Sequence, residues 1–244
     1  KILQQLANIT KSKTEDAMAK TKHVFTTEHA AKLLSGLTSE TAWDRIEKED
    51  KKGGYHSSYQ AILDFAQTVG DNCSEKREHV LACATYGWMP TIMKNFNLEK
   101  SGIPRPIQRI KEANSKEGAI SLIQEMGSEG IIKNSWVGAS KFMHFLNPSF
   151  FPIWDTRVAE KFSEHCINYT LNGSDGTNTD SMPKAYSFAN KKTAYLNYTK
   201  FILEQEDKKH SWIRHVKTRF EEEYEYTPTS VRCLELMLFA KGQP

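Results

Sequence analysis

Residues 134–157 read NSWVGASKFMHFLNPSFFPIWDTR, and this stretch decides how the fold is interpreted. It is dense in Trp, Phe and Pro and carries few charges. The helical pattern before it is predicted to end near Ile132, and Trp136–Gly138 to form a tight turn. A second helix is then predicted over Ala139–Leu146. The stretch therefore predicts two helices joined by a hairpin, whose free backbone amides at the second helix are suited to binding phosphate.

A third helix is predicted to follow directly. Pro148 and Pro152 prevent the second helix from continuing, because proline lacks the backbone N–H and clashes with the preceding turn. Asp155 then stands before an apolar stripe at helical spacing over residues 158–166. Aspartate is among the best residues for capping a helix N-terminus through its carboxylate. Asp155 is therefore predicted to open the third helix.

Lys141 and Asp155 are the residues that carry chemistry. They lie on consecutive helices, so a chain reversal between them would bring both side chains to the lips of one cleft. A carboxylate stabilises the oxocarbenium-like charge that develops when an N-glycosidic bond breaks. A partly desolvated lysine, with its pKa lowered, can attack C1′ and form a Schiff base. The ordinary alternatives are that Asp155 only caps a helix and that Lys141 is a solvated surface lysine.

The stretch resembles the helix-hairpin-helix core of the DNA glycosylase superfamily, a group of all-helical base-excision enzymes. Residues 152–158, PIWDTRV, match the Pro-x-x-Asp-Thr-x-Val-type element of that core. Lys141 stands where the bifunctional members keep their Schiff-base lysine. The sequence SKFMHFLNPSFFPIWD is most similar in character to archaeal 8-oxoguanine glycosylases and to bacterial antiphage glycosylases that excise glucosylated hydroxymethylcytosine from phage DNA.

The chain departs from the family pattern at three points. Only Gly138 is present where the hairpin usually has two glycines, so Ala139 takes the place of the second. The spacing from lysine to aspartate is shorter than usual, and the iron–sulfur cysteines of several members are absent. Two mechanisms therefore stay open. Lys141 acts as the nucleophile, or it contacts phosphate or helps electrostatically while Asp155 alone activates water.

The resemblance implies an all-α fold of two helical subdomains with the active-site cleft between them. Residues 55–153 would form a helical barrel that ends in the helix-hairpin-helix motif. Residues 1–54 and 154–244 would pack together as the second subdomain. This division places the lysine and the aspartate on opposite sides of the cleft.

The rest of the chain agrees with a helical fold, because apolar residues repeat at three- and four-residue steps nearly throughout. A last helix is predicted to open at Thr227 and Pro228 and to run to about Ala240. It is apolar almost all round, so it is predicted to be buried. Residues 170–182 are polar and contain two glycines, which is typical of a connecting loop.

The implied partner is double-stranded DNA with a modified base that is flipped out of the stack. Phosphate contacts are predicted from Gly138, Ala139, Ser140, Arg157, Lys191 and Lys192. Walls of the base pocket are predicted from Trp136, Trp154, Phe151, Trp88 and Phe142. The alternative for each of these aromatic side chains is a place in the hydrophobic core.

Charge along the chain is uneven. Residues 191–220 contain eight Lys/Arg and three acidic residues, a local charge of +5, whereas residues 221–244 carry a local charge of −3. Four aromatics interleave with the basic block: Tyr195, Tyr198, Trp212 and Phe220. The block is either a phosphate-binding stripe or a pair of solvated helix faces whose aromatics point inward.

Composition excludes several other classes of protein. The chain has 244 residues and a net charge of +3. Its apolar runs are far shorter than the roughly 20 residues that a membrane span needs, and it shows no signal peptide. The four cysteines form no CxxC pair and the histidines lack metal-ligand spacing, so we expect a cytoplasmic monomer without metal or cofactor. A non-catalytic helix-hairpin-helix DNA-binding module and a helical protein-interaction scaffold are the alternative functions.

Overall fold

The computed structural model describes residue 31 and residues 34–50, 55–71, 76–88, 96–128, 131–132, 135–159 and 191–240. Of these residues 72% are helical and none forms a strand, so the predicted all-α fold is confirmed. An isolated antiparallel bridge joins Phe96 to Ile132. The predicted loop at 170–182 and the third helix beyond residue 159 lie outside the described residues.

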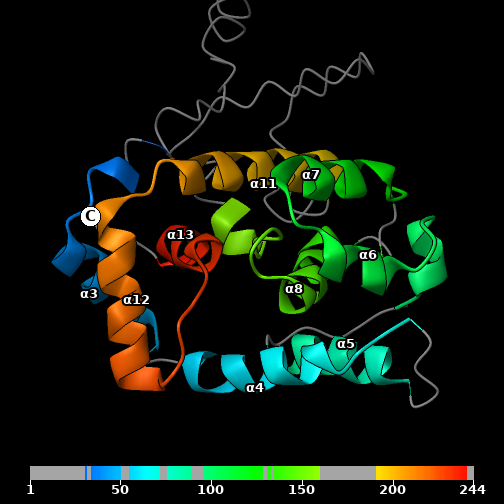
Figure 1. The fold of residues 1–244 in the computed structure, drawn as a ribbon, viewed down its shortest axis with the longest axis horizontal. Helices are drawn as coiled ribbons and strands as arrows, with labels where there is room; N and C mark the ends of the chain where they lie inside the picture. Colours follow the sequence, from blue (N-terminus) through cyan, green and yellow to red (C-terminus); the bar gives the residue numbers. More distant parts are fainter. Residues whose placement is uncertain are drawn as a thin grey trace, which may run out of the picture.

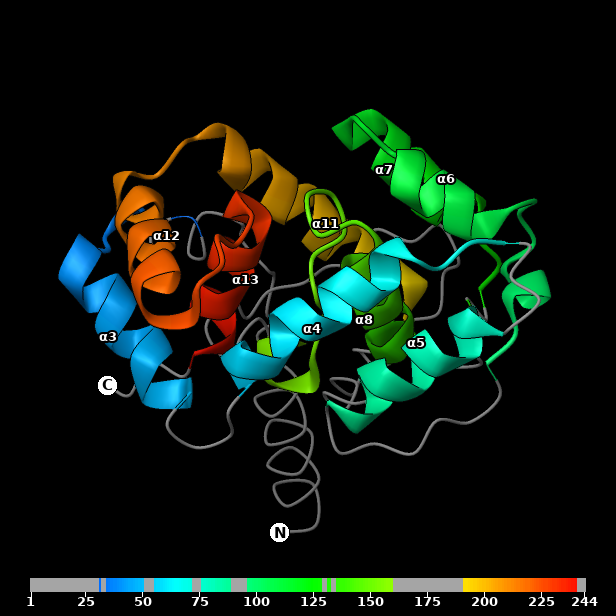
Figure 2. The same cartoon turned by 60° about the horizontal axis from the view of Figure 1, so that its bottom comes forward.

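The helices surround a central pair (Figures 1 and 2). In chain order they are α3 (Ser39–Asp50), α4 (Tyr55–Gln67), α5 (Arg77–Gly87), the 3₁₀ helix η1 (Leu98–Ser101), α6 (Pro106–Glu112), α7 (Lys116–Glu125), α8 (Trp136–Leu146), α11 (Lys192–Asp207), α12 (Ser211–Tyr224) and α13 (Ser230–Phe239). In Figure 1, α8 and α13 occupy the centre, with α4 and α5 below them, α11 and α7 above, and α3 and α12 to the left. The central position explains why both α8 and α13 are almost entirely buried.

Helix α8 starts three residues earlier than the sequence suggests. Ser135 is its N-cap, and the Ser135 hydroxyl accepts a hydrogen bond from the backbone N–H of Gly138 at 3.1 Å. Serine is a favoured N-cap because it satisfies an amide that the helix itself leaves free. The predicted tight turn at Trp136–Gly138 is therefore wrong: these residues form the first turn of α8.

The helix before it, α7, ends at Glu125 rather than near Ile132. The C-terminal carbonyls of α7 are satisfied from elsewhere in the fold, since the Lys192 ammonium donates hydrogen bonds to the carbonyls of Gln124 and Met126. Residues 126–128 and 131–132 are not helical, and the carbonyl of Ile131 accepts from the N–H of Asn97 at 3.1 Å. A basic side chain at a helix C-terminus also interacts favourably with the helix dipole.

Gly138 has a packing role. The side chain of Tyr86 lies directly over it, so that a Cβ at this position would overlap the Tyr86 hydroxyl and lie 2.8 Å from its Cζ and 3.1 Å from Cδ1 of Ile132. Glycine therefore lets α5 and α8 approach each other closely, and this contact, not a turn, explains the glycine.

We expect Gly138→Ala to lower the free energy of unfolding by about 1–3 kcal/mol, because overpacking forces side chains and backbone to shift. The matched control is Gly87→Ala, which also adds a methyl group to a helix but meets no atom within 4 Å. Urea unfolding followed by circular dichroism measures both changes. Equal stability of the two variants would contradict the packing role of Gly138.

The last described helix, α13, is buried as predicted but begins two residues later. Its N-cap is Thr229, whose hydroxyl accepts from the N–H of Arg232 at 3.1 Å. The same hydroxyl donates to the carbonyl of Pro148 at 2.9 Å, which joins the start of α13 to the end of the α8 region. The second contact is tertiary, and it fixes the cap at Thr229 instead of Thr227.

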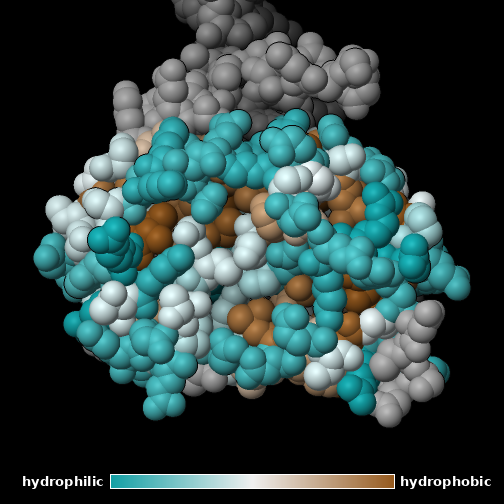
Figure 3. Space-filling view, in the orientation of Figure 1, coloured by the Kyte–Doolittle hydropathy of each residue, from teal (hydrophilic) through white to brown (hydrophobic). Residues whose placement is uncertain are grey.

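Helix packing joins the two ends of the described chain. Helix α3 packs against α12 and α13, and α11 packs against α7 and α13. One continuous hydrophobic cluster runs through all of these helices, and the division into two subdomains stays a prediction. None of the helices in the described ranges is both long and apolar enough to cross a bilayer. On the face shown in Figure 3 most of the surface is hydrophilic, with hydrophobic residues visible in patches between helices.

Candidate active site

The structure brings Lys141 and Asp155 together. The Lys141 Nζ lies 3.4 Å from Asp155 Oδ2, and the two side chains are only 4% and 13% exposed. Lys141 is on the second turn of α8, and Asp155 follows the loop of residues 151–154 that leaves this helix. The amine and the carboxylate therefore meet, as the chain reversal between the two helices predicted.

Asp155 caps a helix and faces the amine at the same time. Residues 156–159 are helical, and Asp155 Oδ1 accepts a hydrogen bond from the N–H of Arg157 at 2.8 Å. The first helical bond runs from the N–H of Ala159 to the carbonyl of Asp155 at 2.9 Å. The predicted cap is confirmed, and the second carboxylate oxygen stays directed at Lys141.

The burial of Lys141 changes its chemistry. Desolvation lowers the pKa of its amine from the usual value for lysine, and the neighbouring Asp155 carboxylate opposes this effect by stabilising the charged form. The solvated-lysine interpretation is wrong, because the side chain is buried. A buried amine with a lowered pKa holds more of the neutral, nucleophilic form at a given pH than a surface lysine does.

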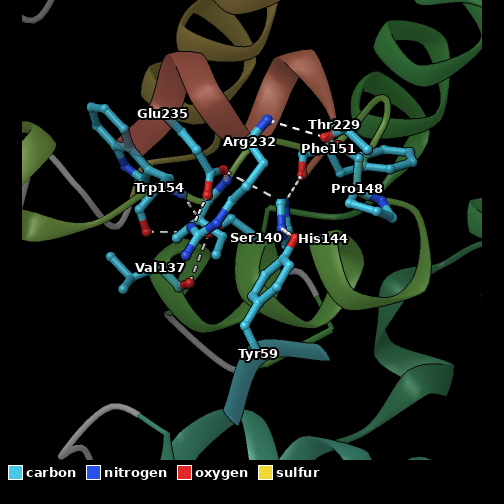
Figure 4. Close-up of polar contacts among 11 residues, drawn as sticks. Tyr59, Val137, Ser140, His144, Pro148, Phe151, Trp154, Thr229, Arg232 and Glu235 are labelled. Atoms are coloured by element: carbon cyan, nitrogen blue, oxygen red, sulfur yellow. Dashed lines mark hydrogen bonds and ion pairs between the residues drawn. The ribbon is translucent and has the colours of Figure 1, made fainter. Parts of the chain in front are cut away.

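Ser140 fastens the loop to α8. Its hydroxyl accepts from the N–H of Trp154 at 3.0 Å and lies 2.8 Å from the carbonyl of Val137 and 3.2 Å from the carbonyl of Trp154 (Figure 4). The bond to Trp154 crosses from the helix to the residue directly before Asp155. Ser140 therefore contributes to the position of the aspartate.

His144 fastens the start of the same loop. Its Nδ1 lies 2.8 Å from the carbonyl of Phe151, and its Nε2 lies 2.6 Å from the hydroxyl of Tyr59 on α4. Burial lowers the pKa of the imidazole well below its usual value, with the nearby Arg232 acting in the same direction, so the ring is neutral. The partners then assign the tautomer: Nδ1–H donates to the carbonyl, and Nε2 accepts from the tyrosine hydroxyl.

Two buried charged residues on α13 complete the surroundings of the loop, and the sequence reasoning missed both. Glu235 accepts a hydrogen bond from the N–H of Ile153 and forms an ion pair with Arg232 (Figure 4). Burial raises the pKa of Glu235 to about 7, against the opposing effect of the Arg232 charge. A signal for them exists in the sequence, because an acid and a base three residues apart interrupt an otherwise apolar helix.

The predicted phosphate contacts are spread over different environments. Gly138, Ala139 and Ser140 are buried within α8. Arg157 is exposed, with its guanidinium 5.1 Å from the ring centre of Phe239. Lys191 is exposed at the N-cap of α11, whereas Lys192 is half-buried against the end of α7. Arg157 and Lys191 are thus the two of the six whose side chains face solvent.

The basic block over residues 191–220 is partly used within the fold. Its four interleaved aromatics are buried, as the inward-facing alternative predicted. The Lys217 ammonium donates to the Ser230 hydroxyl at 3.1 Å, and Arg219 pairs with Glu223 on its own helix. The net positive charge of the block therefore overstates the number of cations available to a ligand.

The five aromatic residues predicted to line the base pocket differ in burial. Four of them are fully buried in the core: Trp136, Trp154, Phe151 and Phe142. Trp88, at the end of α5, is partly exposed, and its ring centre lies 6.0 Å from that of Tyr59. Trp88 is therefore the one of the five predicted pocket residues that is partly exposed.

Among the residues that the structure describes, no group of three or more His, Cys, Asp or Glu side chains is arranged to hold a metal ion. Comparisons of the chain with protein-family models, with curated proteins and with solved structures gave no match. The chemistry of the site therefore rests on its own geometry.

Proposed function

We propose that this protein is a DNA glycosylase that excises a modified base from double-stranded DNA. The observation that carries the proposal is the contact of 3.4 Å between a buried lysine amine and an aspartate carboxylate at the start of a helix. The resemblance of residues 134–158 to the helix-hairpin-helix glycosylase core assigns roles to the same two residues. The resemblance and the geometry therefore support the proposal through the same two residues.

In the proposed reaction Lys141 acts as a neutral amine. The bond between C1′ of the sugar and the base breaks, and its electron pair leaves with the base. The Asp155 carboxylate stabilises the positive charge that develops on the sugar. The departing base takes up a proton from water. The lone pair of the amine forms the new bond to C1′, and the nitrogen then loses a proton to Asp155 or water. The bond from C1′ to the ring oxygen breaks, the oxygen takes up a proton, and C1′ and the nitrogen form a Schiff base. Water then hydrolyses this intermediate.

The modified base belongs to one of two classes that the resemblance implies. These are a glucosylated hydroxymethylcytosine, as in phage DNA, and 8-oxoguanine, as in oxidised DNA. Asp155 is 13% exposed, so its carboxylate reaches the surface of the described structure. The exposed Arg157 and Lys191 are the predicted contacts with the DNA backbone.

The test is the release of free base by the wild-type protein. We expect release from phage DNA that contains glucosylated hydroxymethylcytosine or from a duplex with a single 8-oxoguanine, and none from unmodified DNA. Chromatography of the released bases measures this directly. Binding to the same duplexes at two salt concentrations accompanies the assay, because phosphate contacts make affinity fall as salt rises.

The outcomes separate the three functional classes. Salt-sensitive binding without release of any base would replace the proposal with a non-catalytic DNA-binding module. Absence of binding would favour a helical protein-interaction scaffold. Release of unmodified bases would leave the glycosylase chemistry in place but remove the proposed selectivity.

A further inference from the structure

The loop that carries Asp155 is held by side chains from two central helices (Figure 4). Helix α8 supplies His144 to the carbonyl of Phe151 and Ser140 to the N–H of Trp154. Helix α13 supplies Glu235 to the N–H of Ile153. The three anchors lie on three backbone positions just before Asp155, so they define where the loop enters the next helix.

Glu235 is the anchor that comes from outside the local sequence. It lies 82 residues from Ile153 along the chain and is 2% exposed. Burying a carboxylate costs free energy unless charged or polar groups pair with it. Glu235 accepts from the Ile153 N–H and pairs with the Arg232 guanidinium, and its Oε2 also lies 3.5 Å from Nδ1 of His144.

The Arg232 partner is itself held in place. Its guanidinium carbon lies 4.5 Å from the ring centre of Tyr59 and 5.5 Å from that of Trp88. A guanidinium over an aromatic face is attracted by the ring quadrupole, and more strongly where water is excluded. The two aromatic rings hold the Arg232 guanidinium, which pairs with Glu235. Glu235 in turn accepts the N–H of Ile153 in the loop.

We propose that Glu235 is a positioning residue for Asp155: by accepting the Ile153 N–H it holds the loop so that the aspartate faces Lys141. The consequence for catalysis rests on the proposed function. The consequence for the contact between Lys141 and Asp155 rests on geometry alone.

The expected effect on the catalytic rate is large because the residue that Glu235 anchors is close to Asp155 in the chain. Ile153 is two residues from Asp155, so a shift of its backbone moves the carboxylate by a similar distance. A displacement of 1 Å in a catalytic group can cost about 10²-fold in rate. The bond from Ser140 to Trp154 remains without Glu235, so a partial displacement with a smaller loss is expected.

A single removal of Glu235 would leave Arg232 buried without its partner, and the protein could fail to fold. The test therefore compares two double variants that both remove the charges. Arg232→Met with Glu235→Gln keeps a side-chain oxygen as acceptor for the Ile153 N–H. Arg232→Met with Glu235→Met has nearly the same shape and no acceptor. Both variants lack the two charges, and only the Met variant lacks an acceptor for the Ile153 N–H. Replacement of a buried ion pair by apolar groups is often well tolerated.

The first measurement needs no substrate. Nuclear magnetic resonance of ¹³C-labelled lysine follows the titration of Lys141, with Lys141→Met for assignment and Asp155→Asn as reference. In the wild-type protein the Asp155 charge raises the pKa of Lys141 relative to the value that burial alone would give. We expect the Gln double variant to keep the wild-type titration and the Met double variant to lose the influence of Asp155.

The second measurement is the kinetics of base release. We expect the Met double variant to show a kcat about 10-fold or more below that of the Gln double variant with KM unchanged, since positioning affects the reacting groups and not the bound DNA. Identical Lys141 titrations in the two folded variants would overturn the positioning role, whatever their kinetics. Absence of base release by the wild-type protein would overturn the proposed function alone, because the titration still decides the role of Glu235.

Discussion

Asp155→Asn is expected to slow base release by about 10²–10³-fold, the loss that follows removal of one electrostatic group aimed at a charged transition state. Asparagine has the same shape and is an equally good N-cap. The bond from the Arg157 N–H to the side-chain oxygen is therefore expected to remain. The substitution keeps the helix cap and removes the charge that faces Lys141, so the buried amine is expected to favour its neutral form.

The measurement is single-turnover base release, with the melting temperature and the affinity for the substrate duplex as accompanying readouts. Asp71→Asn is the control, because Asp71 also caps a helix: its carboxylate accepts from the N–H groups of Ile107 and Gln108 at 2.9 and 2.7 Å. We expect the control to lower stability and leave the rate unchanged. An unchanged rate in Asp155→Asn would reduce Asp155 to a cap.

Lys141→Met is expected to abolish covalent trapping of the protein on DNA by borohydride. Only a lysine amine that forms a Schiff base with C1′ is reduced to a stable crosslink. Methionine fills the volume of the lysine stem with an unbranched apolar chain and suits a buried site. Lys100→Gln, at an exposed lysine outside the predicted site, is the control and is expected to keep full trapping.

The pH dependence of trapping tests the environment of the amine. On a duplex that already contains an abasic site, wild-type trapping is expected to rise with pH and to reach its midpoint below the usual lysine value of 10.5, because burial lowers the pKa of Lys141. In Asp155→Asn the midpoint is expected to lie lower still, since the carboxylate that stabilises the ammonium is removed. A crosslink that persists in Lys141→Met would assign the Schiff base to another amine.

The trapping experiment also distinguishes the two proposed roles of Lys141. Base release by the wild-type protein without any crosslink would exclude Lys141 as nucleophile. Asp155 would then activate water, and the Lys141 charge would act electrostatically. This outcome separates the two mechanisms that the sequence leaves open.

The parts of the site that follow local rules could be predicted from the sequence. Asp155 caps its helix because aspartate before an apolar stripe does so in most contexts, and α8 ends at Leu146 because prolines follow. The closeness of Lys141 to Asp155 follows from the short connection between two consecutive helices. Each of these depends on residues near one another in the chain.

The start of α8 could not be predicted in the same way. A glycine in the sequence GAS favours a turn when only neighbours are considered. The reason for Gly138 is the side chain of Tyr86, 52 residues earlier, which occupies the space of a Cβ. A packing constraint between distant helices leaves no local signal that distinguishes it from a turn.

The contacts of the buried pair on α13 could not be predicted from the sequence. The unusual charges at Arg232 and Glu235 are visible in the sequence, but their partners are not. One partner is the backbone N–H of Ile153, and the others are the rings of Tyr59 and Trp88. Backbone groups are present at every position, so sequence alone does not show which one a buried carboxylate contacts.

The contact between Glu235 and Ile153 can form only late in the synthesis of the described chain, because it needs α13. The lysine and the aspartate leave the ribosome well before α13 does, and the N–H of Ile153 gains its Glu235 acceptor only when α13 docks. Contacts between residues far apart in the chain form late, because closing a long loop is entropically costly. A nascent chain that still lacks α13 would therefore lack the Glu235 anchor of the loop that carries Asp155.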